Sequence, residues 1–317
     1  MHHFFSGRRA ALFVLIVICV SSLAIGCAPA GTQAPDGGTA ESSGGPAEQA
    51  AWEGGSLVII GGGSRPDYVM EKIVELAGGS DCHMVVIPMA SAEPEDTGDY
   101  QSGQLREAGC PEVDYLIFDR ESADSDDVVA RLDGVTGIFF SGGVQGRLLD
   151  HLAGSRLFDR VQEIYLSGGV LGGTSAGAAV MSEIMITGDE NHPLSEDDSF
   201  EVISAGNVVT VEGFGFVSNA IIDQHFVVRK RHNRLISLVL ENPSLVGVGI
   251  DEATAIVMPT PDELWVLGES IAVIYDASEA THIATNDELE LSARDIRMHL
   301  LASGQGYDLA RKQVIER

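Results

Sequence analysis

The chain has 317 residues, enough for two domains or for one α/β domain of roughly 250 residues with extra segments. Its 19 Lys and Arg residues against 47 Asp and Glu residues give a formal net charge of −28 at pH 7. So acidic a chain argues against nucleic acid and anionic membranes as partners, because both repel it. It does not identify a cationic substrate, since an acidic surface that favours solubility has the same composition.

The first 27 residues predict an export signal. An Arg-Arg pair precedes an unbroken apolar run from Ala10 to Val20, and small residues follow, which is the order found in signal peptides. The segment Leu23-Ala24-Ile25-Gly26-Cys27 is similar to a bacterial lipoprotein processing site, although Ala24 stands where leucine is usual. We expect Cys27 to become the lipidated first residue of an exported protein, on the periplasmic or extracellular face. A plain secretory signal or a retained membrane anchor are the alternatives.

Residues 28–55 predict a flexible linker. The stretch is rich in Ala, Gly, Pro, Ser, Thr, Gln and Glu, and it has too few apolar side chains to offset the entropy lost on ordering. We expect a single α/β domain over residues 56–317. Its two cysteines, Cys82 and Cys110, could form a disulfide in an exported chain or remain two buried thiols. No zinc-type ligand spacing occurs, so no metal or other cofactor is expected.

The first half of this domain alternates strands and helices. Ser56–Ile60 is a short, wholly apolar run, typical of a strand buried on both faces of a parallel sheet. The three glycines after it lack both the Gly-x-Gly-x-x-Gly pattern and the Lys-Ser/Thr ending of phosphate loops, so nucleotide binding is rejected. Further strands are predicted at 84–88, 113–118 and 137–140, and helices at 66–77, before 109, at 124–132, around 148–152 and at 157–166.

This alternation predicts a doubly wound, mainly parallel sheet, in which function gathers at the carboxyl ends of the strands. The stretch 186–208 is acidic and irregular and is expected to be a solvated loop. Two apolar strands follow, at 220–224 and 246–250, and each ends in polar residues. The remainder alternates like short antiparallel strands.

Ser175 is the candidate nucleophile. The apolar pair Val170-Leu171 enters Gly172-Gly173-Thr174-Ser175-Ala176-Gly177, and helix-compatible residues follow, which is the nucleophile-elbow pattern. At a helix N-terminus, free N–H groups and the helix dipole favour an anionic tetrahedral intermediate. An ordinary Gly/Ser loop gives the same short match, but the flanking strand and helix patterns favour a nucleophile.

His225 is the candidate base, because it ends an apolar strand and follows Asp223-Gln224. The other candidates, His151 and His232, fall on helix patterns, where a surface or structural role is expected. A base of this kind needs an acid to orient it. Glu252, at the tip of the next strand, is favoured.

The acidic loop supplies two alternatives for the orienting acid, Glu201 and Glu190. Sequence does not show which carboxylate reaches the imidazole. The choice matters for the fold, because an α/β-hydrolase places its acid before its histidine in the chain, whereas Glu252 lies after it.

Two groups of residues are expected to bind the substrate. The N–H of Ala176, with one from the Gly142-Gly143 turn, would form an oxyanion hole. Three arginines after the base, Arg229, Arg231 and Arg234, could hold a substrate carboxylate by bidentate pairing. They could instead form a basic helix face that balances neighbouring acids. Because the chain has few cations, three arginines so close to the proposed base favour the substrate role.

Four motifs occur in order between residues 57 and 258: Phe-Ser-Gly-Gly-Val-Gln145, Gly-Gly-Thr-Ser175-Ala-Gly-Ala, Asp223-Gln224-His225-Phe226 and Gly-Ile-Asp251-Glu252-Ala-Thr-Ala. Together they resemble cyanophycinases, serine exopeptidases related to peptidase E with a fold similar to class I glutamine amidotransferases (flavodoxin-like). The resemblance implies a nucleophile, base and orienting acid at Ser175, His225 and Glu252. It also implies oxyanion N–H groups and a substrate pocket at the following residues: Gly143, Ala176, Gln145, Asp223, Gln224, Arg229, Arg231 and Arg234.

The family hydrolyses cyanophycin, an aspartate polymer with arginine on each side-chain carboxyl, to β-aspartyl-arginine, and its members typically work as homodimers without metal. The chain departs from the family at Val144, where an Asp or Asn is usual, and in the long acidic stretch 186–208. A peptidase E-like enzyme for short peptides with N-terminal aspartate, and a substrate-binding surface lipoprotein without activity, are the alternatives.

Overall fold

A computed structural model describes residues 52–195 and 199–316 of the chain. The predicted signal, Cys27 and most of the predicted linker lie outside the described residues. The described part belongs to a unit that runs from Ala51 to Arg317. Within it, no helix combines the length and the apolar character needed to cross a bilayer.

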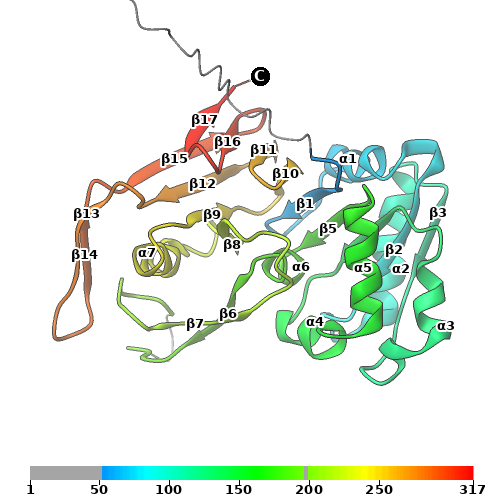
Figure 1. Cartoon of the computed structure of the whole chain (residues 1–317), viewed down its shortest axis with the longest axis horizontal. Coiled ribbons are helices and arrows are strands. Elements are labelled where there is room, and N and C mark those ends of the chain that lie inside the picture. The colour runs from blue at the N-terminus through cyan, green and yellow to red at the C-terminus, as the bar shows by residue number, and fades with distance from the viewer. Residues whose placement is uncertain (1–51, 196–198, 317) are drawn as a thin grey trace, which may run out of the picture. The chain divides into compact units, whose positions relative to one another are not determined.

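The centre of this unit is a nine-stranded mixed sheet (Figure 1). Its parallel strands are β1 (Ser56–Ile60), β2 (His83–Ile87), β3 (Glu112–Tyr115), β4 (Gly137–Phe140) and β5 (Val170–Thr174). Its antiparallel strands are β10 (Thr254–Thr260), β11 (Glu263–Gly268), β16 (Gly306–Asp308) and β17 (Gln313–Ile315). The order is β17-β16-β11-β10-β1-β5-β4-β2-β3, so the antiparallel strands extend the parallel sheet beyond β1.

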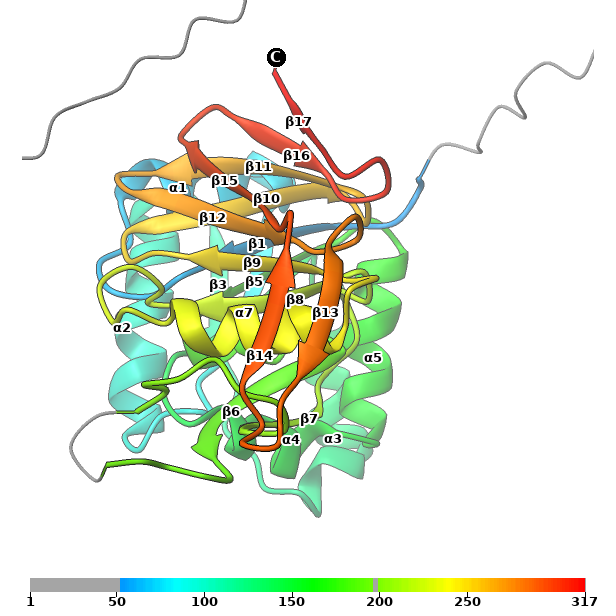
Figure 2. The same cartoon turned by 90° about the vertical axis from the view of Figure 1, so that its left-hand side faces the viewer.

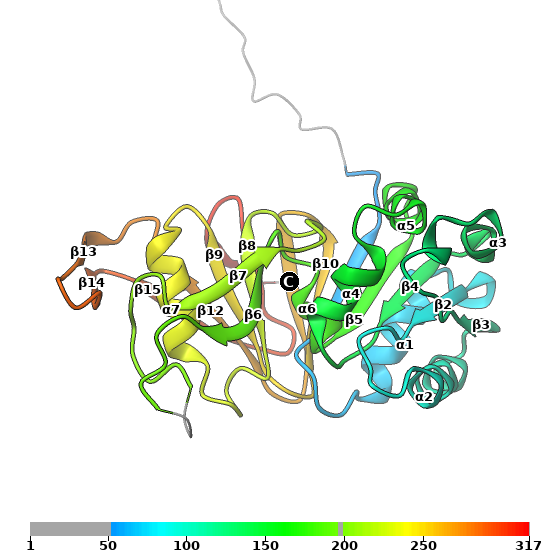
Figure 3. The same ribbon diagram turned by 90° about the horizontal axis from the view of Figure 1, so that it is seen from below.

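Helices cover both faces of the parallel part, as a doubly wound fold requires (Figure 3). One face carries α1 (Asp67–Leu76), η1 (Gly79–Asp81) and α2 (Pro94–Glu107); the other carries η2 (Ser122–Asp124), α3 (Asp126–Val129), η3 (Ala130–Leu132), α4 (Gln145–Leu152) and α5 (Arg156–Leu166). Strand β1 is buried on both faces: Leu57 and Ile59 enter one core cluster, Val58 and Ile60 the other. The helix predicted at 124–132 is broken into short turns, and Ser125 caps α3 by accepting a hydrogen bond from the N–H of Val128 (3.3 Å).

A second sheet packs beside the first (Figure 2). It contains β8 (Ala220–Gln224), β9 (Val246–Ile250), β12 (Ile271–Asp276) and β15 (Arg297–Ala302), in the order β15-β12-β9-β8. Residues on one face, such as Ile222 and Val248, join the core cluster of the large sheet. Ile221 on the other face joins a separate cluster with Leu235 of α7 (His232–Glu241). The carboxyl ends of β8 and β9 thereby face the same region as the end of β5.

Two smaller pairs of strands complete the unit. β6 (Ile184–Glu190) pairs with β7 (Val208–Glu212), and β13 (Thr281–Thr285) pairs with β14 (Leu291–Arg294). The expectation of an irregular loop over 186–208 is therefore wrong at its two ends. Met185 and Ile186 are buried in the core clusters, and this burial fixes β6 despite the acids around it.

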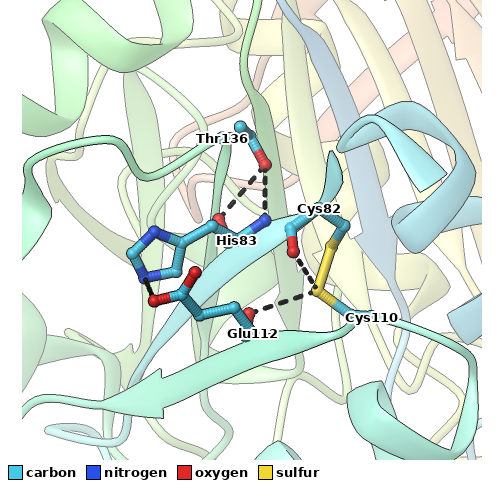
Figure 4. The surroundings of a disulfide bond; sticks show 5 residues. All are labelled: Cys82, His83, Cys110, Glu112 and Thr136. Atoms are coloured by element: carbon cyan, nitrogen blue, oxygen red, sulfur yellow. Dashed lines mark hydrogen bonds and ion pairs between the residues drawn. A yellow bond between two sulfur atoms is a disulfide. The ribbon is translucent and has the colours of Figure 1, made fainter. Parts of the chain in front are cut away.

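Cys82 and Cys110 form a disulfide with a Cα–Cα distance of 5.3 Å (Figure 4). It joins the start of β2 to the chain that enters β3. Beside it, Thr136 Oγ1 accepts a hydrogen bond from the N–H of His83 (3.0 Å), and the His83 ring faces the carboxylate of Glu112 (3.8 Å). The disulfide therefore reinforces the amino-terminal edge of the sheet.

Candidate active site

Ser175 lies at the sharp turn between β5 and α6 (Ala176–Ala179). Its φ of 53° and ψ of −108° are a strained conformation for a residue with a side chain. A Cβ on Gly177 would lie 2.2 Å from the carbonyl oxygen of Phe140, so only glycine fits there. The turn is the predicted elbow, but α6 has only four residues. A helix this short adds little dipole, so free N–H groups must supply the stabilisation that we had assigned partly to the dipole.

Three side chains form a hydrogen-bonded series across three strand ends. Ser175 Oγ lies 2.8 Å from His225 Nε2, and His225 Nδ1 lies 2.5 Å from Glu252 Oε1. Glu190 instead accepts a hydrogen bond from Asn207 (2.8 Å), and Glu201 is an exposed residue whose backbone carbonyl accepts from α7. Of the three acids considered, Glu252 is therefore the one in contact with the imidazole.

The surroundings of His225 hold its pKa below the ordinary value for histidine. Burial is the main cause, and the positive charges of Arg229 and Arg231 act in the same direction. The hydrogen bond and the charge of Glu252 oppose them. The lowered pKa favours the neutral ring, which is the form that accepts a proton from a serine.

Two backbone N–H groups beside Ser175 are free to bind an oxyanion. Those of Gly143 and Ala176 have no backbone acceptor within the described part of the chain. Gly143 has a φ of 141°, and a Cβ there would lie 2.0 Å from the carbonyl oxygen of Ala90. A Cβ on Gly142 would lie 3.4 Å from that of Ser175, so this turn is next to the serine. The glycines thus permit the close approach that an oxyanion hole needs.

The glycines after β1 have a role that was not predicted from the sequence. His225 N–H donates to the carbonyl of Gly61 (2.7 Å). A Cβ on Gly62 would lie 2.3 Å from Cε1 of the His225 ring, and one on Gly63 would lie 2.8 Å from the Cβ of Glu252. This segment is therefore the backbone support of the base and its acid. The signal was a glycine run at a strand end, which we tested only as a phosphate loop.

The predicted substrate-binding arginines divide into two groups. Arg234 and Asp223 form a bidentate pair, with Nε 2.7 Å from Oδ2, and their side chains are 3% and 0% exposed. They have no free face for a substrate, which corrects the expectation that both line the pocket. Arg231 donates to Oε1 of Gln224 (2.6 Å) and its side chain is 16% exposed, and Arg229 is exposed. Arg229 remains accessible beside the base, and Arg231, which also lies 3.8 Å from Asp223 Oδ1, is partly accessible there.

Asp251 is a further residue to which the sequence analysis gave no role. Its Oδ1 accepts hydrogen bonds from the N–H groups of Val227 and Val228 (both 3.0 Å), and its Oδ2 accepts from Ser270 Oγ (2.7 Å). Asp251 thereby fixes the turn that follows His225 and carries Arg229. An acid directly before Glu252 was the only signal in the sequence.

Gln145 ties α4 to β6. Its Nε2 donates to the carbonyls of Ile186 (2.9 Å) and Thr187 (2.6 Å). Its amide donors are thus occupied by the protein, which differs from a residue that binds substrate through them. Within residues 52–195 and 199–316, no group of three or more His, Cys, Asp or Glu side chains is placed to hold a metal ion.

The sequence model of Peptidase family S51 matches residues 57–262. A cyanophycinase of Synechococcus elongatus is 35% identical over 82% of this chain and 81% of its own length, and one of Nostoc sp. is 33% identical over 82% and 87%. The crystal structure of a peptidase from an acI-B1 Actinobacterium aligns with a TM-score of 0.58 at 24% identity, over 80% of this chain and 97% of that one. This last likeness supports the mixed α/β fold.

Proposed function

Because this chain belongs to peptidase family S51 and is a serine-type peptidase, we propose that Ser175 is its nucleophile, His225 its general base and Glu252 the acid that orients the base. The observation that carries this proposal is the series of hydrogen bonds from Ser175 Oγ to His225 (2.8 Å) and from His225 to Glu252 (2.5 Å). The same three groups, in the same roles, define the serine-peptidase triad.

In the first half of the reaction, Ser175 Oγ attacks the scissile carbonyl carbon while His225 Nε2 takes the hydroxyl proton. The negative charge on the carbonyl oxygen is stabilised by the N–H groups of Gly143 and Ala176. The intermediate collapses as the C–N bond breaks, and His225 gives its proton to the leaving amine. A water molecule then repeats the sequence on the acyl-enzyme and restores the free serine.

The proposed substrate is cyanophycin, cleaved to β-aspartyl-arginine dipeptides. Its support is the identity of about a third with proteins named cyanophycinase. We assign Arg229 and Arg231, the accessible cations beside the base, to a carboxylate of the substrate.

We also propose that the protein is exported, lipid-anchored at Cys27 and homodimeric. The support for export and anchoring is the order of charged, apolar and small residues before Cys27. The homodimer rests on the family resemblance. Mass spectrometry of the mature N-terminus tests lipidation, and light scattering of the purified protein tests the dimer.

Product analysis tests the substrate. The purified chain and its Ser175→Ala variant are incubated with cyanophycin, and soluble products are identified by mass spectrometry. We expect β-aspartyl-arginine from the parent and none from the variant. Cleavage of aspartyl dipeptides without attack on the polymer would favour a peptidase E-like specificity. Binding without any cleavage would contradict the assigned roles and favour a substrate-binding surface protein.

A further inference from the structure

A cavity of about 330 Å³ lies between α4 and the β6–β7 pair, beside the turn that contains Gly143. Gly142 approaches Ser175 closely, and Val144, two residues further on, lines the cavity. Two peptide units span at most about 7 Å, so the cavity wall at Val144 begins within about that distance of the part of the turn that approaches the nucleophile. A group that enters it would branch from the substrate next to the scissile bond.

The walls of the cavity are apolar. They are formed by Val144, Leu149, Met185 and Val211. Two of these side chains are well exposed, Val144 by 53% and Val211 by 42%. Exposed apolar walls of this kind suit the methylene chain of a long side chain, which gains free energy by covering them.

The rim of the cavity carries negative charge. Asp150 and Asp189 line it, and neither carboxylate forms an ion pair in the described part of the chain. The side-chain donors nearby are already used: Gln145 donates to two carbonyls of β6, and Thr187 Oγ1 donates to the carbonyl of Val209 (3.1 Å). The side chains therefore offer a ligand apolar walls and, at the rim, the carboxylate acceptors of Asp150 and Asp189.

We propose that this cavity is a specificity site for a substrate arm with an aliphatic stem and a cationic end, held next to the bond that Ser175 attacks. The assignment rests on the proposed function only for the position of the reacting bond. An arginyl side chain has this form, with three methylenes and a guanidinium that binds carboxylates through paired N–H groups.

Equilibrium binding to the Ser175→Ala protein tests the site without turnover. Calorimetry would compare β-aspartyl-arginine with β-aspartyl-citrulline, whose side chain has the same length but no charge. Two exposed ion pairs together predict roughly tenfold tighter binding of the arginyl ligand. The added change Asp150→Asn with Asp189→Asn should abolish that preference and leave citrulline binding unchanged.

A matched control removes two carboxylates elsewhere, by Asp127→Asn with Asp159→Asn, on α3 and α5 outside the cavity. The control should keep the preference. Equal binding of both ligands by the Ser175→Ala protein, or an equal loss in the control, would overturn the proposal. Turnover by the parent is scored separately: a preference that depends on Asp150 and Asp189 without hydrolysis refutes the proposed function alone, whereas hydrolysis without preference refutes this site alone.

Discussion

At the scale of single residues, the position of the base depends on the absence of side chains at Gly62 and Gly63. The His225 ring and the side chain of Glu252 lie against Gly62 and Gly63, where a Cβ would come within 2.3 Å and 2.8 Å of them. A side chain at Gly62 must displace His225, and one at Gly63 must displace Glu252. A shift of about 1 Å at a reacting group reduces the rate by about 10²-fold.

We therefore predict that Gly62→Ala lowers kcat by about 10²-fold, because its methyl group pushes the imidazole away from Ser175. Gly109→Ala is the matched control: the two glycines have φ values of 107° and 102°, but no atom lies within 4 Å of a Cβ at Gly109. Both variants share the backbone strain, so both should lose thermal stability, and Gly62→Ala should lose more because it adds the clash, as calorimetry would measure. An equal fall in kcat for both would show that strain alone explains the loss.

The charge of Arg229 predicts a pH effect. The pKa of His225 lies below its ordinary value, because of burial and then of nearby cations such as Arg229. As pH falls through this pKa the imidazole becomes protonated and can no longer accept the serine proton, so kcat/KM falls. Arg229→Gln removes a positive charge and raises the pKa of His225, so the acid limb of the pH profile should move to higher pH.

A suitable control for that profile is Arg131→Gln, since Arg131 is an exposed cation on η3 whose partner is Asp114. The acid limb of the kcat/KM profile of Arg131→Gln should coincide with that of the parent. The height of the Arg229→Gln profile does not test the prediction, because lost substrate binding lowers kcat/KM at every pH. The test is the pH at which the acid limb lies. A limb that stays in place or moves to lower pH would show that Arg229 does not act on His225.

At the scale of elements, the sequence predicted where the strands end but not which strands lie beside one another. The apolar runs of β5, β8 and β9 and their polar endings pointed to Ser175, His225 and Glu252. A fully apolar run shows that a strand is buried, but not which sheet it joins, and β8 and β9 belong to the second sheet.

Contacts between distant segments were likewise beyond the sequence. Gly249 is needed because a Cβ there would lie 2.3 Å from the Phe226 ring, and Arg234 is buried because Asp223 pairs with it. The spacing of the arginines suggested one common surface. Only the packing of α7 on β8 separates the buried Arg234 from Arg229 and Arg231, since that packing decides which side chains turn inward.

The disulfide lies at the amino-terminal ends of β2 and β3, opposite the end of the sheet that carries the site. We therefore predict that it stabilises the fold and does not affect catalysis. Cys82 and Cys110 are 28 residues apart, and closing a loop of that length stabilises a fold by about 3.5 kcal/mol. Replacing both, Cys82→Ala with Cys110→Ala, should lower Tm by roughly 7–14 °C in a domain of this size. The site lies at the carboxyl ends of the strands, so kcat below the transition should be unchanged.

Scanning calorimetry of the parent with and without reductant provides the companion measurement, and the alanine pair should be insensitive to the reductant. An unchanged Tm would mean that the thiols are not joined in the purified protein. A lower kcat at a temperature where the variant is fully folded would contradict the separation between the disulfide and the site.

At the scale of the whole molecule, the negative charge acts on substrates before they touch the site. A net charge of −28 surrounds the chain with a negative potential, which attracts cations over about 8 Å at physiological ionic strength. Close to Ser175 the sign changes locally, because Arg229 and Arg231 lie beside the base. The far field therefore favours substrates with a net positive charge, and the near field favours a carboxylate at the reacting end.

This division predicts different salt dependences for two substrates. For β-aspartyl-arginine amide, whose net charge is positive because the arginyl carboxylate is capped, kcat/KM should fall steadily as NaCl rises from roughly 20 to 500 mM, because screening removes the long-range attraction that raises the association rate. For β-aspartyl-leucine amide, whose charges cancel, it should change little. Stopped-flow measurement of association with the Ser175→Ala variant locates the effect in the association rate rather than in the chemical step. Equal slopes for the two substrates would show that salt acts on the site itself, and the net charge would then have no part in choosing the substrate.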